Sequence, residues 1–203
     1  MEESARRPAK KRTMSMRDVL ETTAKPKEVR PTRSTSVHAP PVRQASSIAR
    51  LHNGQDVCVV THRGSVDWLE TFYLYGFDKN SLFCTLMPLR HEDAAWSTEE
   101  SAYMAELFRL LETGKMRLPR GKTATTYIAE KLHSPDARVH RHMVESNIQP
   151  SQSESVTPQA MSADEVTRFK EIKVGFLRTL EAWVIDRLHE RGVDQSWVVS
   201  IKY

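Results

Sequence analysis

A cluster of cationic side chains in the middle of the chain could bind phosphate groups or acidic surfaces. Residues 115–143, called the basic segment below, carry seven Lys and Arg against two acidic residues, a formal charge of +5. The flanking stretches are acidic, with −6 for residues 51–114 and −2 for residues 144–203. A local excess of one sign of charge attracts partners of the opposite sign. The basic segment therefore predicts a binding surface for a polyanion.

Two short helices are expected to position these cations. Thr123 is suited to cap the first helix, and Ile128 and Leu132 fall together on one of its faces. Ser134 and Pro135 then end this helix and begin the next, with the serine as N-cap and the proline at the first helical position. The sequence thus predicts two consecutive helices joined by a tight turn.

The spacing within this pair resembles a helix-turn-helix. In that motif a small residue lets the helices cross closely, a turn follows four residues later, and an aliphatic residue ten positions after the small one packs beneath the second helix. Ala129, His133 and Val139 stand at these positions. Many members of this class have glycine at the turn, so His133 is a departure. A helical hairpin with a solvated basic face is the alternative interpretation.

The resemblance implies that the second helix contacts a groove of duplex DNA. We accordingly expect a nuclear regulatory protein that binds nucleic acid, DNA rather than RNA. Cations of the amino-terminal tail would add attraction to phosphates that is independent of base sequence. The expected contacts are six side chains of the basic segment, namely Lys122, Lys131, Arg138, His140, Arg141 and His142.

The first 50 residues differ in composition from the rest of the chain. They carry a charge of +7 and five of the ten prolines, with no glycine and no aromatic residue. Such a segment buries too little apolar surface to offset the entropy lost on ordering. We expect a disordered basic tail over residues 1–50, then a single mainly helical domain over 51–203 with an exposed linker at 145–161.

Two patterns in this tail point to regulation. Ser15, Ser36 and Ser46 each follow an arginine by three residues, a spacing that basophilic kinases accept. Phosphorylation of all three would add roughly −5 to −6 of charge and cancel most of the tail's positive charge. We expect a nuclear phosphoprotein, with a cytoplasmic location as the alternative. A compact cluster of basic residues suits the acidic groove of a nuclear import receptor, and the alternative is that these side chains are simply solvated in the tail. The cluster comprises Arg6, Arg7, Lys10, Lys11 and Arg12.

The body is expected to be mainly α, of the α+β type. Ser-x-x-Glu capping boxes precede helices expected over 98–113 and 163–191. Residues 66–77 fit a helix or a strand equally well. Three short apolar stretches predict strands of a small sheet whose pairing the sequence leaves open, at 57–60, 82–87 and 197–203.

The long helix expected over 163–191 supports a second class of function. Its apolar stripe includes Phe176 and Trp183. A non-enzymatic interaction module would present this stripe to a partner protein or to a second copy of the chain. A stripe of this width is more often the core-facing side of a helix, which favours the nucleic-acid interpretation over this one.

Several other chemistries lack the residues that they need. Cys58 and Cys84 alone form neither a disulfide framework nor a four-thiolate zinc site. Gly121-Lys122-Thr123 lacks the earlier glycine of a phosphate-binding loop, because Met116 stands there. No nucleophile elbow or paired acid and base carboxylates are evident. We expect no enzymatic activity, no cofactor and no bound metal, and no apolar run approaches the roughly 20 residues of a membrane span.

A longer stretch, about residues 95–185, is similar to largely uncharacterised proteins of oomycetes and diatoms. The similarity centres on residues 121–132 and on Arg138-Val139. That family reads roughly Gly-x-Thr-Leu-Arg-x-Tyr-Leu-x-x-Lys-Leu, followed by a cysteine and later by a lysine pair. This chain has Ser134 in place of the cysteine and Arg141-His142 in place of the lysines. The resemblance implies a domain boundary and no particular activity.

Overall fold

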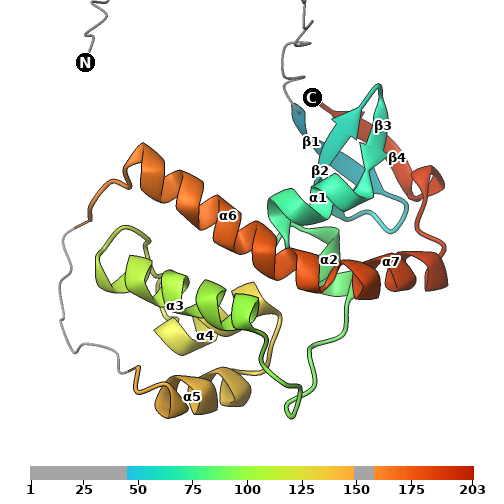
Figure 1. The fold of residues 1–203 in the computed structure, drawn as a ribbon. Coiled ribbons are helices and arrows are strands. Elements are labelled where there is room, and N and C mark those ends of the chain that lie inside the picture. The colour runs from blue at the N-terminus through green and yellow to red at the C-terminus, as the bar shows by residue number, and fades with distance from the viewer. Residues whose placement is uncertain (1–44, 149–157) are drawn as a thin grey trace, which may run out of the picture. The chain divides into compact units, whose positions relative to one another are not determined.

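The structure, a computed structural model, describes residues 45–148 and 158–203. The first of these residues form a β-hairpin. Strands β1 (Ala45–Leu51) and β2 (Asp56–His62) pair antiparallel. Strand β3 (Ser65–Asp67) pairs with β2, and β4 (Val198–Lys202) pairs with the other edge of β1. The strand order is β3-β2-β1-β4, so the last strand lies beside the first (Figure 1).

Most of the described residues are helical. Asp67, Ser97 and Ser162 each begin a helix, and each side chain accepts a hydrogen bond from the backbone N–H three residues later. Figure 1 shows the longest helix, α6, running beside α3. The helices of the described residues are α1 (Trp68–Tyr75), α2 (Leu82–Leu86), α3 (Thr98–Glu112), α4 (Ala124–Leu132), α5 (Asp136–Glu145), α6 (Ala163–Thr179) and α7 (Glu181–Glu190), with a 3-10 turn at Gln195–Trp197.

The expected α+β class is confirmed, and three of its details are corrected. Residues 82–87 form no strand, because Ser81 caps the short helix α2 there. Residues 66–77 divide between β3 and α1. Strand β1 begins at Ala45, inside the expected tail, so the ordered body starts earlier than residue 51. The described residues 45–148 and 158–203 belong to one compact unit.

The expected helix over 163–191 is two helices that meet at Leu180. The hydroxyl of Thr179 donates to the carbonyl of Phe176 over 2.7 Å, and the amide of Leu180 donates to Leu177 rather than to Phe176. The Phe176 carbonyl would accept the Leu180 amide in a continuous α-helix. The threonine side chain therefore takes the place of one backbone hydrogen bond, and the chain turns there.

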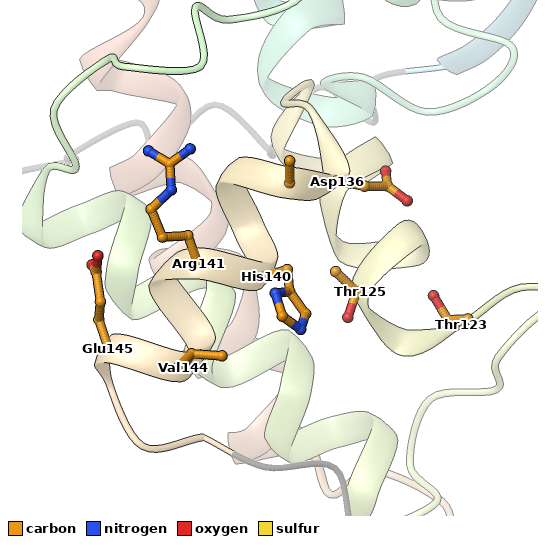
Figure 2. Close-up of a pocket in the computed structure, with 8 residues that line it drawn as sticks. Thr123, Thr125, Asp136, His140, Arg141, Val144 and Glu145 are labelled. Carbon is orange, nitrogen blue, oxygen red and sulfur yellow. The ribbon is translucent and has the colours of Figure 1, made fainter.

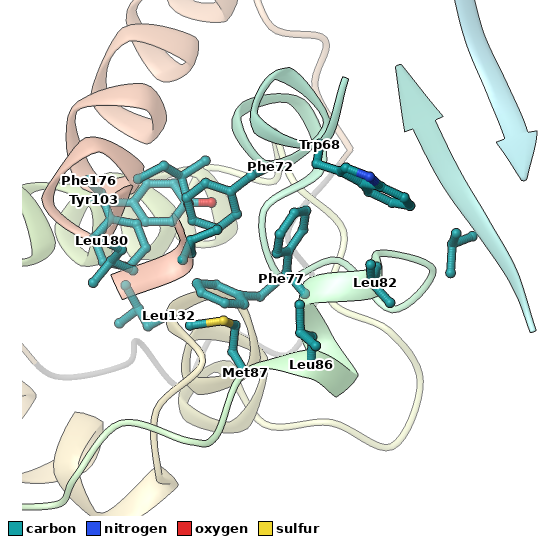
Figure 3. Close-up of a cluster of buried hydrophobic side chains, with 14 of the residues drawn as sticks. Trp68, Phe72, Phe77, Leu82, Leu86, Met87, Tyr103, Leu132, Phe176 and Leu180 are labelled. Atoms are coloured by element: carbon teal, nitrogen blue, oxygen red, sulfur yellow. The ribbon is translucent and has the colours of Figure 1, made fainter. Parts of the chain in front are cut away.

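The main core lies between the sheet, α1, α3 and α6, and it is rich in aromatic rings (Figure 3). The ring of Phe72 contacts those of Phe77 and Phe83, with centroids 5.7 and 5.0 Å apart. The ring of Phe176 stacks on that of Tyr103, with centroids 5.2 Å apart. Phe176 is fully buried, so the apolar stripe of 163–191 is a core face at this position and not an exposed surface for a partner.

Candidate interaction site on helices α4 and α5

The corner between α4 and α5 depends on a left-handed residue. His133 has φ 52° and ψ 49°, a conformation that usually favours glycine or asparagine. The amide of Ser134 donates to the carbonyl of Ala129 and closes the end of α4. Pro135, and not the expected Ser134, is the N-cap of α5. The predicted tight turn is therefore present at His133, and the second helix begins one residue later than expected.

Packing explains why histidine occupies this turn. Its imidazole stacks on the ring of Phe77, with centroids 4.5 Å apart and planes 10° from parallel. Its Nε2–H donates to the carbonyl of Met87 over 2.9 Å. Burial lowers the pKa of His133 below its usual value, which favours the neutral ring. The side chain thus links the α4–α5 corner to the residues that follow α2.

The helix pair shows the buried positions that its spacing predicted. Ala129 and Val139 are almost completely buried, and Ile128 and Leu132 lie beside them in the core. A small side chain at Ala129 removes the bulk that would otherwise hold the two helices apart. These contacts fix α5 against α4 and leave the opposite side of α5 in solvent.

Arg138 was expected to contact nucleic acid, and this expectation is wrong. Its side chain is 2% exposed, and it donates from Nη1 and Nη2 to the two carboxylate oxygens of Glu100, over 2.6 and 2.9 Å. It also donates to the carbonyls of Ala94 and Ala95. Because all of these acceptors come from the chain itself, Arg138 attaches α5 to the start of α3 and to the preceding loop.

His142 was also expected on the binding face, and it is largely covered. Its ring stacks on Trp96 at a centroid distance of 3.9 Å, and its Nε2 lies 3.1 Å from the hydroxyl oxygen of Ser101. The guanidinium carbon of Arg138 lies 4.1 Å from the centroid of the same tryptophan ring. Burial lowers the pKa of His142, although the nearby Glu145 acts in the opposite direction. Trp96 therefore covers one helical face of α5.

The remaining cations of the basic segment are mostly paired as well. Lys131 pairs with Asp78 from the loop after α1, and Lys115 pairs with Glu165 of α6 over 2.5 Å. Lys122 pairs with Glu130 within the segment. Arg141 remains exposed, with a loose 3.4 Å contact to Glu92. Four carboxylates from outside the segment, those of Asp78, Glu92, Glu100 and Glu165, thus face four of its seven cations.

The solvent side of α5 carries a mixture of chemistries. Figure 2 shows this face beside the start of α4, where eight residues line an open concavity of about 910 Å³. Val144 is 64% exposed, and His140 and Arg141 project from the same face. Asp136 and Glu145 lie at the two ends of the helix. The lining residues are Thr123, Thr125, Asp136, Ala137, His140, Arg141, Val144 and Glu145.

Sequence reasoning missed Glu100 and Trp96 as the groups that hold α5 in place. The Ser97-x-x-Glu100 pattern predicted a capping box, and the hydroxyl of Ser97 does accept from the amide of Glu100. The Glu100 carboxylate, however, points toward Arg138 in the interior. A fully buried glutamate on an apolar helix face requires a cation, but the sequence does not say which one.

Comparison with protein-family models, with curated proteins and with solved structures found no match. In the described part of the chain, no group of three or more His, Cys, Asp or Glu side chains is arranged to hold a metal ion. None of its helices has the length and apolarity needed to cross a bilayer. The nuclear-targeting cluster at residues 6–12 and the candidate phosphorylation sites Ser15 and Ser36 lie outside the described residues. Ser46 lies in β1, paired with Val60, and so is not part of a flexible tail.

Proposed function

We propose that this protein is a non-catalytic interaction module that binds a partner protein through the outer face of α5. The pairing of the basic segment carries the proposal. Five of its seven cations face the chain's own carboxylates, so the segment presents a smaller positive field to a polyanion than its charge of +5 suggests. Its outer face instead combines exposed apolar, cationic and anionic groups, as protein interfaces do.

The chemistry of this face indicates what the partner carries. An apolar side chain of the partner would pack on the apolar side chains that line the concavity, those of Val144 and Ala137. Asp136 and Glu145 are nine residues apart on α5, or about 13 Å along the helix axis. The complementary partner is a short amphipathic segment with one apolar anchor and basic side chains on either side of it.

DNA binding by a helix-turn-helix is the second candidate, and the packing of the corner supports it. Ala129 and Val139 are buried at the expected spacing, and His133 supplies the left-handed turn. His140 and Arg141 project from the exposed face of α5. If α5 binds DNA, fewer of its residues can contact the duplex than the sequence suggested, because the side chains of Arg138 and His142 pack against other parts of the chain. A nuclear location belongs to this candidate.

Selection of short random peptides by the full-length protein tests the first candidate. We expect selected peptides to share an apolar residue flanked by Lys or Arg, and to bind with at least about tenfold lower affinity to Val144→Glu. Val199→Glu is the matched control, because Val199 lies on β4 and is similarly exposed, at 58% against 64%. Selected peptides that bind both variants as they bind the unaltered protein would exclude the α5 face.

Duplex DNA separates the two candidates. Gel-shift titrations with random duplex at several salt concentrations would compare the unaltered protein with the variant His140→Ala/Arg141→Ala. Both proteins keep the basic amino-terminal residues, so any difference between them reports on α5 itself. The DNA candidate would be supported if the double variant binds duplex DNA more weakly and with a flatter salt dependence, and if the selection experiment yields no binding peptides. Identical curves would remove it.

A further inference from the structure

A second concavity lies away from the proposed interaction face, where the loop between α2 and α3 meets the junction of α6 and α7. It has a volume of about 350 Å³. Leu180, at the break between the two helices, forms part of its wall together with Trp183 and the exposed Leu89. Its lining residues are Leu89, Arg90, His91, Ala94, Leu180 and Trp183.

Arg90 brings a poorly partnered positive charge to this concavity. Its side chain is only 15% exposed, and its Nη1 lies 3.1 Å from Oε2 of Glu100. That contact is an ion pair whose orientation does not make a hydrogen bond, so the buried Nη1 lacks a hydrogen-bond partner among the described residues. Because Nη1 is itself buried against Glu100, a ligand in the concavity would pair with the accessible part of the Arg90 guanidinium and not with this nitrogen.

The local charge balance is also incomplete. Glu100 already accepts hydrogen bonds from both terminal nitrogens of Arg138. Arg90 and Arg138 therefore share one buried carboxylate, which leaves one positive charge uncompensated at this point. Burial lowers the pKa of Arg90; the nearby Glu100 opposes this shift, and the smaller effect of Arg138 adds to it. An additional anion next to Arg90 would restore the balance.

We propose that this concavity is a binding site for a small aromatic carboxylic acid, whose carboxylate pairs with Arg90 and whose ring packs between Trp183 and Leu89. A guanidinium matches a carboxylate in geometry and charge. The aromatic and aliphatic walls suit the apolar body of such a ligand. The volume lies at the lower end of the range for small-molecule sites. The walls offer no second arginine or lysine, so the more highly charged phosphate group is disfavoured.

Phenylacetate and its neutral analogue phenylacetamide provide the test, with the full-length protein. Binding is followed by the shift of the Trp183 indole resonance, which Trp183→Phe assigns in NMR spectra. We expect phenylacetate to move this resonance and to bind at least about tenfold more tightly than phenylacetamide, because only the former has a charge-assisted bond to Arg90. Equal affinities, or no shift of the Trp183 resonance up to the solubility limit, would overturn the proposal.

A pair of variants at Leu89 tests the same site without disturbing the core, because Leu89 is 61% exposed. Leu89→Glu places a competing carboxylate beside Arg90, whereas Leu89→Gln removes the same apolar surface without adding charge. We expect phenylacetate to bind at least about fivefold more weakly to the Glu variant than to the Gln variant. Equal binding to both would show that Arg90 is not the anion receptor. The peptide and DNA assays on α5 are independent of either result.

Discussion

Glu100 and Arg138 form a two-bond ion pair in the interior, and neither side chain is more than 2% exposed. The pair joins the first turn of α3 to α5 across 38 positions of sequence. Arg138, a cation of the basic segment, therefore holds the fold together and is not available to a ligand. The pair also determines which side of α5 faces solvent, because Val139 lies next to Arg138 and is buried with it.

Removing one partner of this pair should be costly. In Arg138→Met the Glu100 carboxylate stays buried with only the ion-pair contact of Arg90, and we expect the free energy of unfolding to fall by about 3 to 5 kcal/mol. Urea unfolding followed by circular dichroism measures the change. Arg141→Met, which removes an exposed cation from the same helix, should change stability by less than about 1 kcal/mol. A similar small effect for both variants would mean that the buried pair does not hold α5.

The stability of the protein should decrease in mild acid because of two histidines. Burial lowers the pKa of both His133 and His142 in the folded state. The unfolded chain, with an ordinary pKa near 6.5, then binds more protons, so stability present above that pH is lost as the pH falls below it. Thermal melts between about pH 5 and pH 7.5 measure how the melting temperature changes with pH. These limits lie about one unit or more on either side of the ordinary histidine pKa near 6.5.

Variants identify the groups responsible for this slope. His133→Asn keeps a residue that tolerates the left-handed turn, and His142→Gln keeps a polar group near Ser101. The double variant should show a flatter dependence of melting temperature on pH than the comparison variant His140→Gln, whose substitution lies at an exposed position of α5. An unaltered slope in the double variant would assign the acid sensitivity elsewhere.

Glu165 should titrate at unusually low pH. A hydrogen bond from Lys115 and another from the amide of Ser162 lower its pKa from 4.5 to about 2. Its contribution to stability is therefore present at neutral pH and is lost as the pH falls below the unfolded value toward 2. Carbon-detected NMR of the side-chain carboxyl measures this pKa directly. In Lys115→Met we expect a clearly higher value, and a value near 4.5 in the unaltered chain would contradict the contact.

Phe176 should behave as a core residue and not as an interface residue. It is fully buried and stacks on Tyr103, so Phe176→Ala should lower the free energy of unfolding by about 3 to 5 kcal/mol. Urea unfolding gives this loss, and sedimentation of the folded fraction tests self-association. Val199→Ala, at an exposed position of β4, should have almost no effect. A dimer that dissociates in Phe176→Ala without loss of stability would restore the stripe of 163–191 as an interface.

The sequence predicted local structure well where neighbouring residues decide it. The caps at Ser97, Thr123 and Ser162 depend on side chains that bind amides three residues away, so their patterns are visible in the chain itself. Residues 82–87 were wrongly predicted as a strand, because a short apolar run is compatible with a strand or a buried helix. The helix break at Leu180 was missed because the hydroxyl of Thr179 has two possible bonding patterns, with solvent or with a backbone carbonyl.

By itself the sequence determined that residues 123–145 form two helices around a tight turn, and that Ala129 and Val139 are buried between them. Only the tertiary structure decided what the cations on these helices do. Charge interactions depend on distance and burial, and the carboxylates that face Lys115, Lys131, Arg138 and Arg141 come from far along the chain. The number of charges along a segment therefore describes its electrostatic potential in the unfolded chain. In the folded chain, that potential also depends on the opposite charges that folding brings next to the segment.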